Sequence, residues 1–196
     1  MTPPALARAL VEHFPLSGRC LDPCRGSGAF FDAMKARAKR QKKLGVPDED
    51  RIASVDWCEL GEGRDFLADN PGNRGEFSWI VTNPPWSQIA AFMERAFTMA
   101  DNVVFLATIN HAFTSMRRRL AAQSGFSLVG IVEFDWPKKW AKSGFQLGAM
   151  HYAKRRKVEA WETVVELCHI RPLDWKDDGQ GGRLALPADA GLDLGA

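Results

Sequence analysis

Short, almost continuously apolar runs alternate along the chain with longer segments in which apolar residues recur every three or four positions. This pattern predicts buried strands that alternate with amphipathic helices. We expect strands at 19–22, 51–58, 78–82, 103–108, 127–134, 146–153 and 164–170. We expect helices after Thr2-Pro3-Pro4, with Thr2 as the cap, and at 29–44, 89–99 and 115–123. Continuously apolar strands separated by helices predict an α/β fold, with a mostly parallel sheet and helices on both faces.

A glycine-rich turn, Asp22-Pro23-Cys24-Arg25-Gly26-Ser27-Gly28, follows the first predicted strand. Its glycines let the backbone approach a ligand and turn tightly into a helix. The carboxylate before the turn disfavours a phosphate and suits a cationic ligand or ribose hydroxyls. Ligands of open parallel sheets bind at the carboxyl ends of strands, where Glu59 also falls. The alternative is a plain strand-to-helix turn.

A second unusual segment, Asn83-Pro84-Pro85-Trp86, directly follows another predicted strand. Successive prolines end the strand and leave a carbonyl without a partner in the sheet. That carbonyl and the Asn83 amide oxygen form two acceptors for the hydrogens of an exocyclic amino group. Trp86 offers a flat face on which a base can stack. The alternative is a proline-terminated strand followed by a core tryptophan.

Together, the two segments resemble the motifs of S-adenosylmethionine-dependent N6-adenine DNA methyltransferases. The glycine turn is similar to their cofactor motif, and Asn-Pro-Pro-Trp is similar to their catalytic motif, with Trp where Tyr or Phe is commoner. The motif order matches the gamma-type arrangement and covers residues 2 to about 110. The resemblance implies a Rossmann-like methyltransferase fold. It is specific for the superfamily and less specific for the substrate.

The resemblance also implies a cofactor, S-adenosyl-L-methionine, and the residues that bind it. A segment at Thr2-Pro3 closes over the methionine end, Glu59 holds the ribose hydroxyls, and Asp65 meets the adenine amino group. The implied cofactor-binding residues are Thr2, Pro3, Asp22, Pro23, Gly26, Gly28, Glu59, Asp65, Phe66 and Asn83. Relatives usually fit a helix and another strand between the positions of Glu59 and Asp65. The connection here is too short for both, so we expect one sheet element to be missing or moved.

The implied reaction is direct displacement at the methyl group by the amino nitrogen of the target base. Four residues are the catalytic candidates: Asn83, Pro84, Pro85 and Trp86. The Asn83 side chain and the Pro84 carbonyl would accept hydrogen bonds from the amino group and aim its lone pair. The target base would have to leave the duplex, and stacking on Trp86 would offset part of that cost.

Charge is unevenly distributed along this chain of 196 residues, whose overall net charge is only +2. The segment 114–157 has ten basic and two acidic residues, whereas 158–196 is acidic. A basic middle suits a polyanionic partner, and we expect DNA, with RNA left open. The candidate nucleic-acid contacts are Arg117, Arg118, Lys138, Lys139 and Lys142. The alternatives are a solvated helix face and a loop with packed tryptophans.

Composition sets the remaining expectations. No 18-residue run lacks charge, so no membrane span is expected. Four cysteines without a C-x-x-C pair predict neither a metal site nor a disulfide scaffold. The start of the sequence lacks a signal-peptide pattern. We therefore expect a cytoplasmic protein of a bacterial or phage-infected cell. We expect a catalytic domain over 1–172 and a flexible, Gly-rich, acidic tail over 173–196.

Three rival functions remain open. An rRNA or tRNA adenine could replace DNA adenine, and a protein glutamine amide could replace the base. A degenerate methyltransferase fold could serve only as a binding subunit, although intact Asp22, Gly26, Gly28 and Asn83 argue against it. No target-recognition domain is recognisable, so any sequence selectivity must come from loops.

Overall fold

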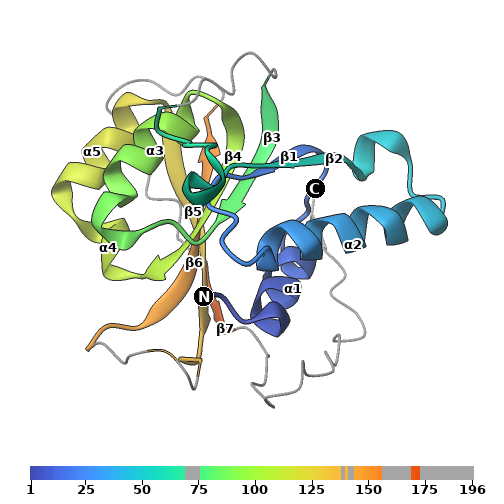
Figure 1. Cartoon of the computed structure of the whole chain (residues 1–196). Coiled ribbons are helices and arrows are strands. Elements are labelled where there is room, and N and C mark those ends of the chain that lie inside the picture. Colours follow the sequence, from blue (N-terminus) through green and yellow to red (C-terminus); the bar gives the residue numbers. More distant parts are fainter. Residues whose placement is uncertain (69–75, 138–139, 141–143, 156–168, 173–196) are drawn as a thin grey trace, which may run out of the picture.

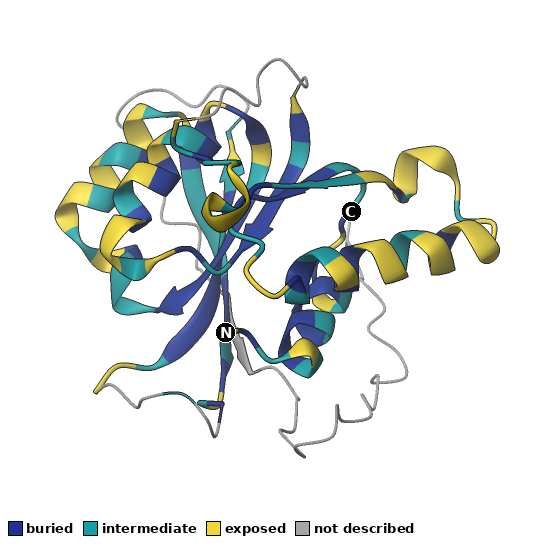
Figure 2. Ribbon diagram, in the orientation of Figure 1, coloured by how far each residue is buried: buried dark blue, intermediate teal, exposed yellow. Residues whose placement is uncertain are grey.

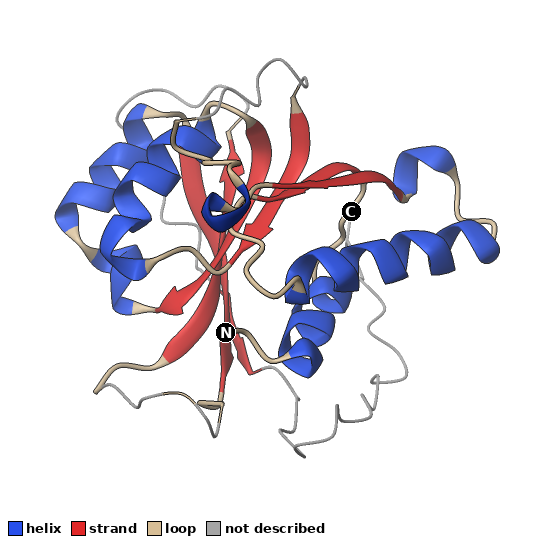
Figure 3. Ribbon diagram, in the orientation of Figure 1, coloured by secondary structure: helices blue, strands red, loops and turns tan. Residues whose placement is uncertain are grey.

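A computed structural model of the protein describes residues 1–68, 76–137, 140, 144–155 and 169–172. Its strands form one sheet in the order β2-β1-β3-β4-β6-β5-β7 (Figure 3). The strands are β1 (Gly18–Asp22), β2 (Ile52–Trp57), β3 (Phe77–Thr82), β4 (Ala100–Thr108), β5 (Phe126–Phe134), β6 (Leu147–Lys154) and β7 (His169–Pro172). All neighbouring strands pair in parallel except β6, which is antiparallel to both β4 and β5. The predicted α/β class with a mostly parallel sheet is therefore confirmed.

Helices cover both faces of the sheet, with α1 and α2 on one side and α3, α4 and α5 on the other (Figure 1). The helices are α1 (Pro4–His13), α2 (Ala29–Lys43), α3 (Ile89–Phe97), α4 (Asn110–Phe113) and α5 (Ser115–Gln123). No described helix is long and apolar enough to cross a membrane.

The alternation of side chains along the central strands creates two hydrophobic cores. In β3, Trp79 and Val81 pack against α1 and α2, whereas Ile80 faces the core beneath α3. Both faces are buried, so the central strands are apolar at nearly every position (Figure 2). This burial holds the carboxyl ends of β1, β3 and β4 side by side.

The observed element bounds lie within a few residues of those predicted, and Ser115–Gln123 is reproduced as α5. Two expectations need correction or limitation. The predicted cap of α1 by Thr2 is wrong, because Pro3 is the N-cap and makes no side-chain capping bond. Of the predicted strand at 164–170, the structure describes 169–170 as part of β7, while 164–168 and the predicted tail lie outside the described residues.

β2 forms one edge of the sheet. The described part of the connection from β2 to β3 contains a 3₁₀ turn at Leu60–Glu62 and an isolated bridge between Glu59 and Arg64, and no strand. This agrees with the expectation that a sheet element is missing between Glu59 and Asp65.

Candidate functional site

Polar side chains gather where the parallel strands β1, β2 and β3 end. Asp22 is the last residue of β1, Thr82 is the last residue of β3, and Glu59 follows β2 by two positions. The Asp22 carboxylate accepts a hydrogen bond of 2.8 Å from the Thr82 hydroxyl. The tertiary structure therefore links the two segments that the sequence singles out, the glycine turn and Asn83-Pro84-Pro85-Trp86.

Asp22 is a buried carboxylate with one unpaired oxygen. Its side chain is only 1% exposed, and Oδ1 accepts from Thr82 and, at 3.3 Å, from the Cys24 backbone N–H. Oδ2 has no hydrogen-bond partner among the described residues. Burial raises the Asp22 pKa to about 7, although hydrogen bonding by the Thr82 hydroxyl and by the Cys24 and Phe31 backbone N–H groups acts in the opposite direction. An unpaired buried acceptor of this kind fits the cationic amino group that S-adenosyl-L-methionine carries.

The glycine turn that follows Asp22 suits close approach of a ligand. Gly26 and Gly28 adopt φ angles of 52° and 92°, which residues other than glycine rarely adopt. A Cβ atom on Gly28 would lie 3.1 Å from an Asp32 carboxylate oxygen. Gly28 is also the N-cap of α2, so the turn leads directly into that helix. Pro23 is buried beneath the turn, whereas Gly26 is exposed.

Glu59 already bonds to the glycine turn. Its Oε2 accepts from the Gly26 backbone N–H at 2.6 Å, and its Oε1 accepts from the Gly61 N–H at 3.3 Å. The carboxylate that the sequence assigns to ribose hydroxyls therefore bridges the ends of β1 and β2. Ligand hydroxyls would have to compete with these two backbone donors.

A cluster of two arginines and a tryptophan lies beside this turn, and the sequence did not predict it. The guanidinium groups of Arg25 and Arg64 lie 4.2 and 4.1 Å from the centroid of the Trp57 ring. Arg25 forms an ion pair with Glu62, and Arg64 forms one of 2.9 Å with Asp56. The cluster ties the glycine turn to β2 and to the segment that follows it. Nothing in the local sequence signals it, because its members come together only through strand pairing.

Asp65 and Phe66 occupy different environments. Asp65 Oδ1 accepts from the Leu67 backbone N–H at 2.9 Å and stabilises a local turn. Phe66 is 2% exposed and packs in the core, with its ring centroid 5.2 Å from that of Phe92. The Phe66 ring is therefore part of the core and is not accessible to a ligand.

The Asn83 amide is held at both ends. Its Nδ2 donates to the Thr2 hydroxyl oxygen at 3.1 Å, and its Oδ1 accepts from the Trp86 indole N–H at 3.3 Å. The same indole N–H also lies 3.3 Å from the carbonyl oxygen of Leu106 in β4. Pro84 is buried, and Pro85 precedes a 3₁₀ turn that begins at Trp86.

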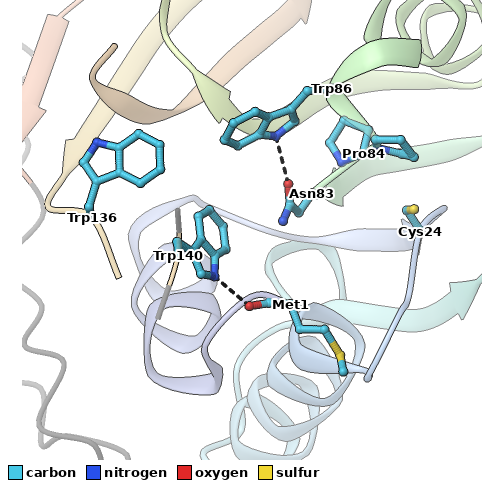
Figure 4. A pocket seen from close by; sticks show the side chains of 8 residues that line it. Met1, Cys24, Asn83, Pro84, Trp86, Trp136 and Trp140 are labelled. Atoms are coloured by element: carbon cyan, nitrogen blue, oxygen red, sulfur yellow. Dashed lines mark hydrogen bonds between the residues drawn. The ribbon is translucent and has the colours of Figure 1, made fainter. Parts of the chain in front are cut away.

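An open cavity of about 570 Å³ lies beside these groups (Figure 4). Its lining residues come from both segments, from the start of the chain and from the connection after β5: Met1, Cys24, Asn83, Pro84, Pro85, Trp86, Trp136 and Trp140. The Trp86 and Trp140 rings are in edge-to-face contact, with centroids 6.3 Å apart, and the Trp140 indole N–H donates to the Met1 carbonyl at 2.9 Å. Because Cys24 of the glycine turn and Asn83 line one cavity, two ligands bound at the two segments would meet there.

The aromatic wall changes the interpretation of the basic segment after β5. The sequence left a loop with packed tryptophans open as the alternative to nucleic-acid contact, and Trp136 and Trp140 do pack against the hydrophobic core that includes α1 and α2. The structure places both in the cavity wall with Trp86. The neighbouring Lys138, Lys139 and Lys142 lie outside the described residues.

The two predicted arginine contacts lie on α5. Arg118 is exposed, whereas Arg117 is half-buried and donates to the Thr114 hydroxyl at 3.2 Å. His111 lies next to Trp86, with ring centroids 6.4 Å apart, and burial together with Arg117 lowers its pKa. Within the described residues, no cluster of His, Cys, Asp and Glu could hold a metal ion.

The comparisons with known proteins give structural matches only. No protein-family model matches the chain, and no curated protein matches its sequence. The M protein of the type I restriction enzyme EcoKI matches with a TM-score of 0.57 and 14% identity, over 79% of this chain and 44% of that one. A candidate class I S-adenosylmethionine-dependent methyltransferase from Listeria monocytogenes matches with a TM-score of 0.54 and 13% identity, over 88% and 64%.

A third match is the modification subunit of a candidate type I restriction enzyme from Vibrio vulnificus YJ016. Its TM-score is 0.53 at 17% identity, over 79% of this chain and 44% of that subunit. The chain thus spans less than half the length of either restriction-enzyme subunit. Within the described sheet, the order β2-β1-β3-β4-β6-β5, with antiparallel β6, is the arrangement typical of these enzymes. The protein therefore has the Rossmann-like fold of class I S-adenosylmethionine-dependent methyltransferases.

Proposed function

We propose that the protein is an S-adenosylmethionine-dependent methyltransferase that acts on the N6 amino group of adenine in DNA. The observation that carries the proposal is the shared cavity. It is lined by the Asn83 amide, the two prolines and three tryptophans, together with Cys24 of the glycine turn. An exocyclic amino group on a flat ring is the acceptor that this combination suits best.

Asp22, Gly26, Gly28 and Glu59 would hold the cofactor, which supplies an electrophilic methyl group when bound. The unpaired Oδ2 of Asp22 would accept from the ligand's amino group. Glu59 would exchange its bonds to Gly26 and Gly61 for ribose hydroxyls. The backbone around Gly26 and Gly28 would lie against the ligand without a Cβ in the way.

Asn83 and Pro84 would orient the acceptor. The free lone pair of Asn83 Oδ1 and the Pro84 carbonyl would accept the two N6 hydrogens, which directs the nitrogen lone pair toward the methyl group. As the nitrogen lone pair bonds to the methyl carbon, the bond from that carbon to the cofactor's sulfur would break and leave a neutral thioether, and the nitrogen would release one proton to solvent. Positioning and exclusion of water by the tryptophan rings would supply most of the acceleration.

A nucleic acid is favoured over a protein acceptor by the basic segment 114–157 and by the tryptophan rings of the cavity, because bases stack on such rings. Two of the structures that share the fold come from type I restriction enzymes. Exposed Arg118 on α5, together with Lys138, Lys139 and Lys142, would contact backbone phosphates.

The experiment is transfer of a labelled methyl group from S-adenosyl-L-methionine to pools of DNA, RNA and protein, followed by nucleoside and amino-acid analysis. We expect N6-methyladenine in the DNA pool and its loss in Asn83→Ala. Label in RNA adenine or in glutamine would assign the site to one of the rival acceptors. No label in any pool, with cofactor bound, would support a binding subunit.

A further inference from the structure

We propose that Trp86 and Thr2 are positioning residues for the Asn83 amide: Trp86 fixes which end of the amide faces the acceptor, and Thr2 holds the amide in place. This inference rests on the proposed function, since it concerns the same Asn83. It adds a role for the Trp86 N–H that is separate from stacking by its ring.

The Trp86 indole nitrogen determines the orientation of the amide. An indole N–H only donates hydrogen bonds, and this one lies 3.3 Å from the Asn83 side chain. The amide atom that faces it must therefore be the oxygen. The indole is itself anchored, because its N–H also lies 3.3 Å from the carbonyl oxygen of Leu106, a fully buried residue of β4.

Thr2 holds the other end of the amide. Its hydroxyl oxygen accepts from Asn83 Nδ2 at 3.1 Å, and Thr2 itself is only 9% exposed. The hydroxyl comes from the segment just before α1, which is distant in sequence from β3. With the nitrogen turned toward Thr2 and the oxygen toward Trp86, both ends of the amide have a partner.

The orientation matters because the two ends of an amide have opposite hydrogen-bonding properties. The Asn83 oxygen retains a second lone pair after it accepts from Trp86, and that lone pair can accept from an amino group. Rotation by half a turn would instead present N–H groups to the N–H groups of the acceptor. The terminal torsion of asparagine is broad and roughly two-fold, so the protein must supply the preference.

A phenylalanine ring would stack but could not supply this preference, because it carries no N–H. We therefore expect Trp86→Phe to bind the acceptor within about three-fold of the parent and to lower the single-turnover rate by about ten-fold, which corresponds to one hydrogen bond. Thr2→Val keeps the branched shape and loses the hydroxyl, and we expect a fall of about three- to ten-fold in the same rate.

The rates would be measured at saturating S-adenosyl-L-methionine and saturating DNA from the pool that is methylated. Thr98→Val is the matched control, because it removes an exposed Thr hydroxyl whose bond, among the described residues, is to the Arg95 carbonyl. We expect the parent rate. Trp140→Phe removes a different indole N–H in the same cavity, which bonds to Met1. Its saturated rate should fall less than that of Trp86→Phe.

A second readout does not depend on turnover. We expect the Trp86 indole resonance in a ¹H–¹⁵N spectrum, assigned by its loss in Trp86→Phe, to shift in Asn83→Ala and in Thr2→Val, whereas the Trp140 resonance stays unchanged in Asn83→Ala. An unmoved Trp86 resonance in Asn83→Ala would overturn the inference.

The outcomes separate this inference from the proposed function. If Asn83→Ala is inactive while Trp86→Phe and Thr2→Val both keep the parent rate, the inferred positioning of the Asn83 amide by these two residues is wrong and the proposed function stands. If Asn83→Ala keeps the parent rate, the proposed catalytic role of Asn83 is wrong, and so is the rate effect inferred for Trp86 and Thr2.

Discussion

The candidate site has two ends, the glycine turn with its neighbour Glu59 and the Asn83 segment, which differ in how their polar groups are satisfied. At the glycine turn, Glu59 is bonded to backbone N–H groups, and Asp22 is buried with one oxygen paired and one unpaired. At Asn83, the amide is oriented by Trp86 and Thr2, and the space beside it is open. A ligand at the first end would replace the bonds of Glu59 and pair the free oxygen of Asp22, whereas a ligand at the second end would enter an open cavity lined by tryptophan rings.

The difference follows from the chemistry of the groups. A carboxylate is costly to bury without a hydrogen-bond partner, so Glu59 bonds to backbone N–H groups. A cationic or hydroxylated ligand would replace these groups. Tryptophan faces need no such partner and can line an open cavity. We therefore expect charge-dependent binding at the first end and shape-dependent binding at the second.

The largest effect is expected at Asn83. Asn83→Ala should lower the turnover number by on the order of 10²–10³-fold, because an oriented acceptor aimed at the reacting amino group is lost. Cofactor affinity, measured by calorimetry, should stay within a few-fold of the parent. A variant that loses cofactor binding to the same extent as turnover would show that the two ends are not separable.

Asp22 should respond in opposite ways in binding and in stability. Asp22→Ala should weaken cofactor binding by at least about ten-fold, since one charge-assisted hydrogen bond contributes roughly 1.5–3 kcal/mol. The measurement is calorimetry at pH 8, where most of the parent's Asp22 is ionised. Unchanged affinity would contradict the assignment of this end to the cofactor.

The stability effect of Asp22 depends on pH. Because its folded pKa is raised to about 7, from an ordinary value of 3.8, its contribution to stability is present below about pH 4 and is lost as pH rises through 7. We expect Asp22→Asn to gain stability relative to the parent by roughly 1 kcal/mol per pH unit between pH 5 and 7. Urea unfolding of both proteins at pH 5, 6 and 7 would check this, and a constant difference would contradict it.

Trp86→Ala should act mainly on capture of the acceptor. Loss of a stacking face corresponds to roughly 1–3 kcal/mol, in addition to the effect of the lost N–H on rate. The rise in KM relative to the parent should be smaller for an adenine opposite an abasic site, where less pairing must be broken. Equal losses on matched and abasic-opposed duplexes would contradict a stacking role.

The smallest effect is expected on the exposed helix face. Replacing Arg118 with Ser should reduce the slope of log binding constant against log salt by about one. The complex then makes one phosphate contact fewer, so its formation releases fewer counterions. Met116→Ser, also exposed on α5, is the matched control, since it changes no charge. An unchanged slope in Arg118→Ser would place the nucleic-acid path elsewhere.

Local sequence determined much of the framework. The alternation of apolar runs predicted α5 and the positions of the central strands, because helix and strand periods are local properties. It also predicted that Asp22 ends one strand and that Asn83 follows another, which in a parallel sheet brings them to one edge. The glycines of the turn were predictable because only glycine readily adopts positive φ angles.

Only the tertiary structure decided which side chains meet. Thr2 was expected to cap a helix, yet its hydroxyl bonds to Asn83, 81 positions away. Trp140 reaches Met1 across 139 positions, Phe66 turns into the core, and Arg25 and Arg64 lie over the Trp57 ring. These contacts depend on strand order and on the packing of helices over the sheet, which are long-range properties that no local pattern encodes.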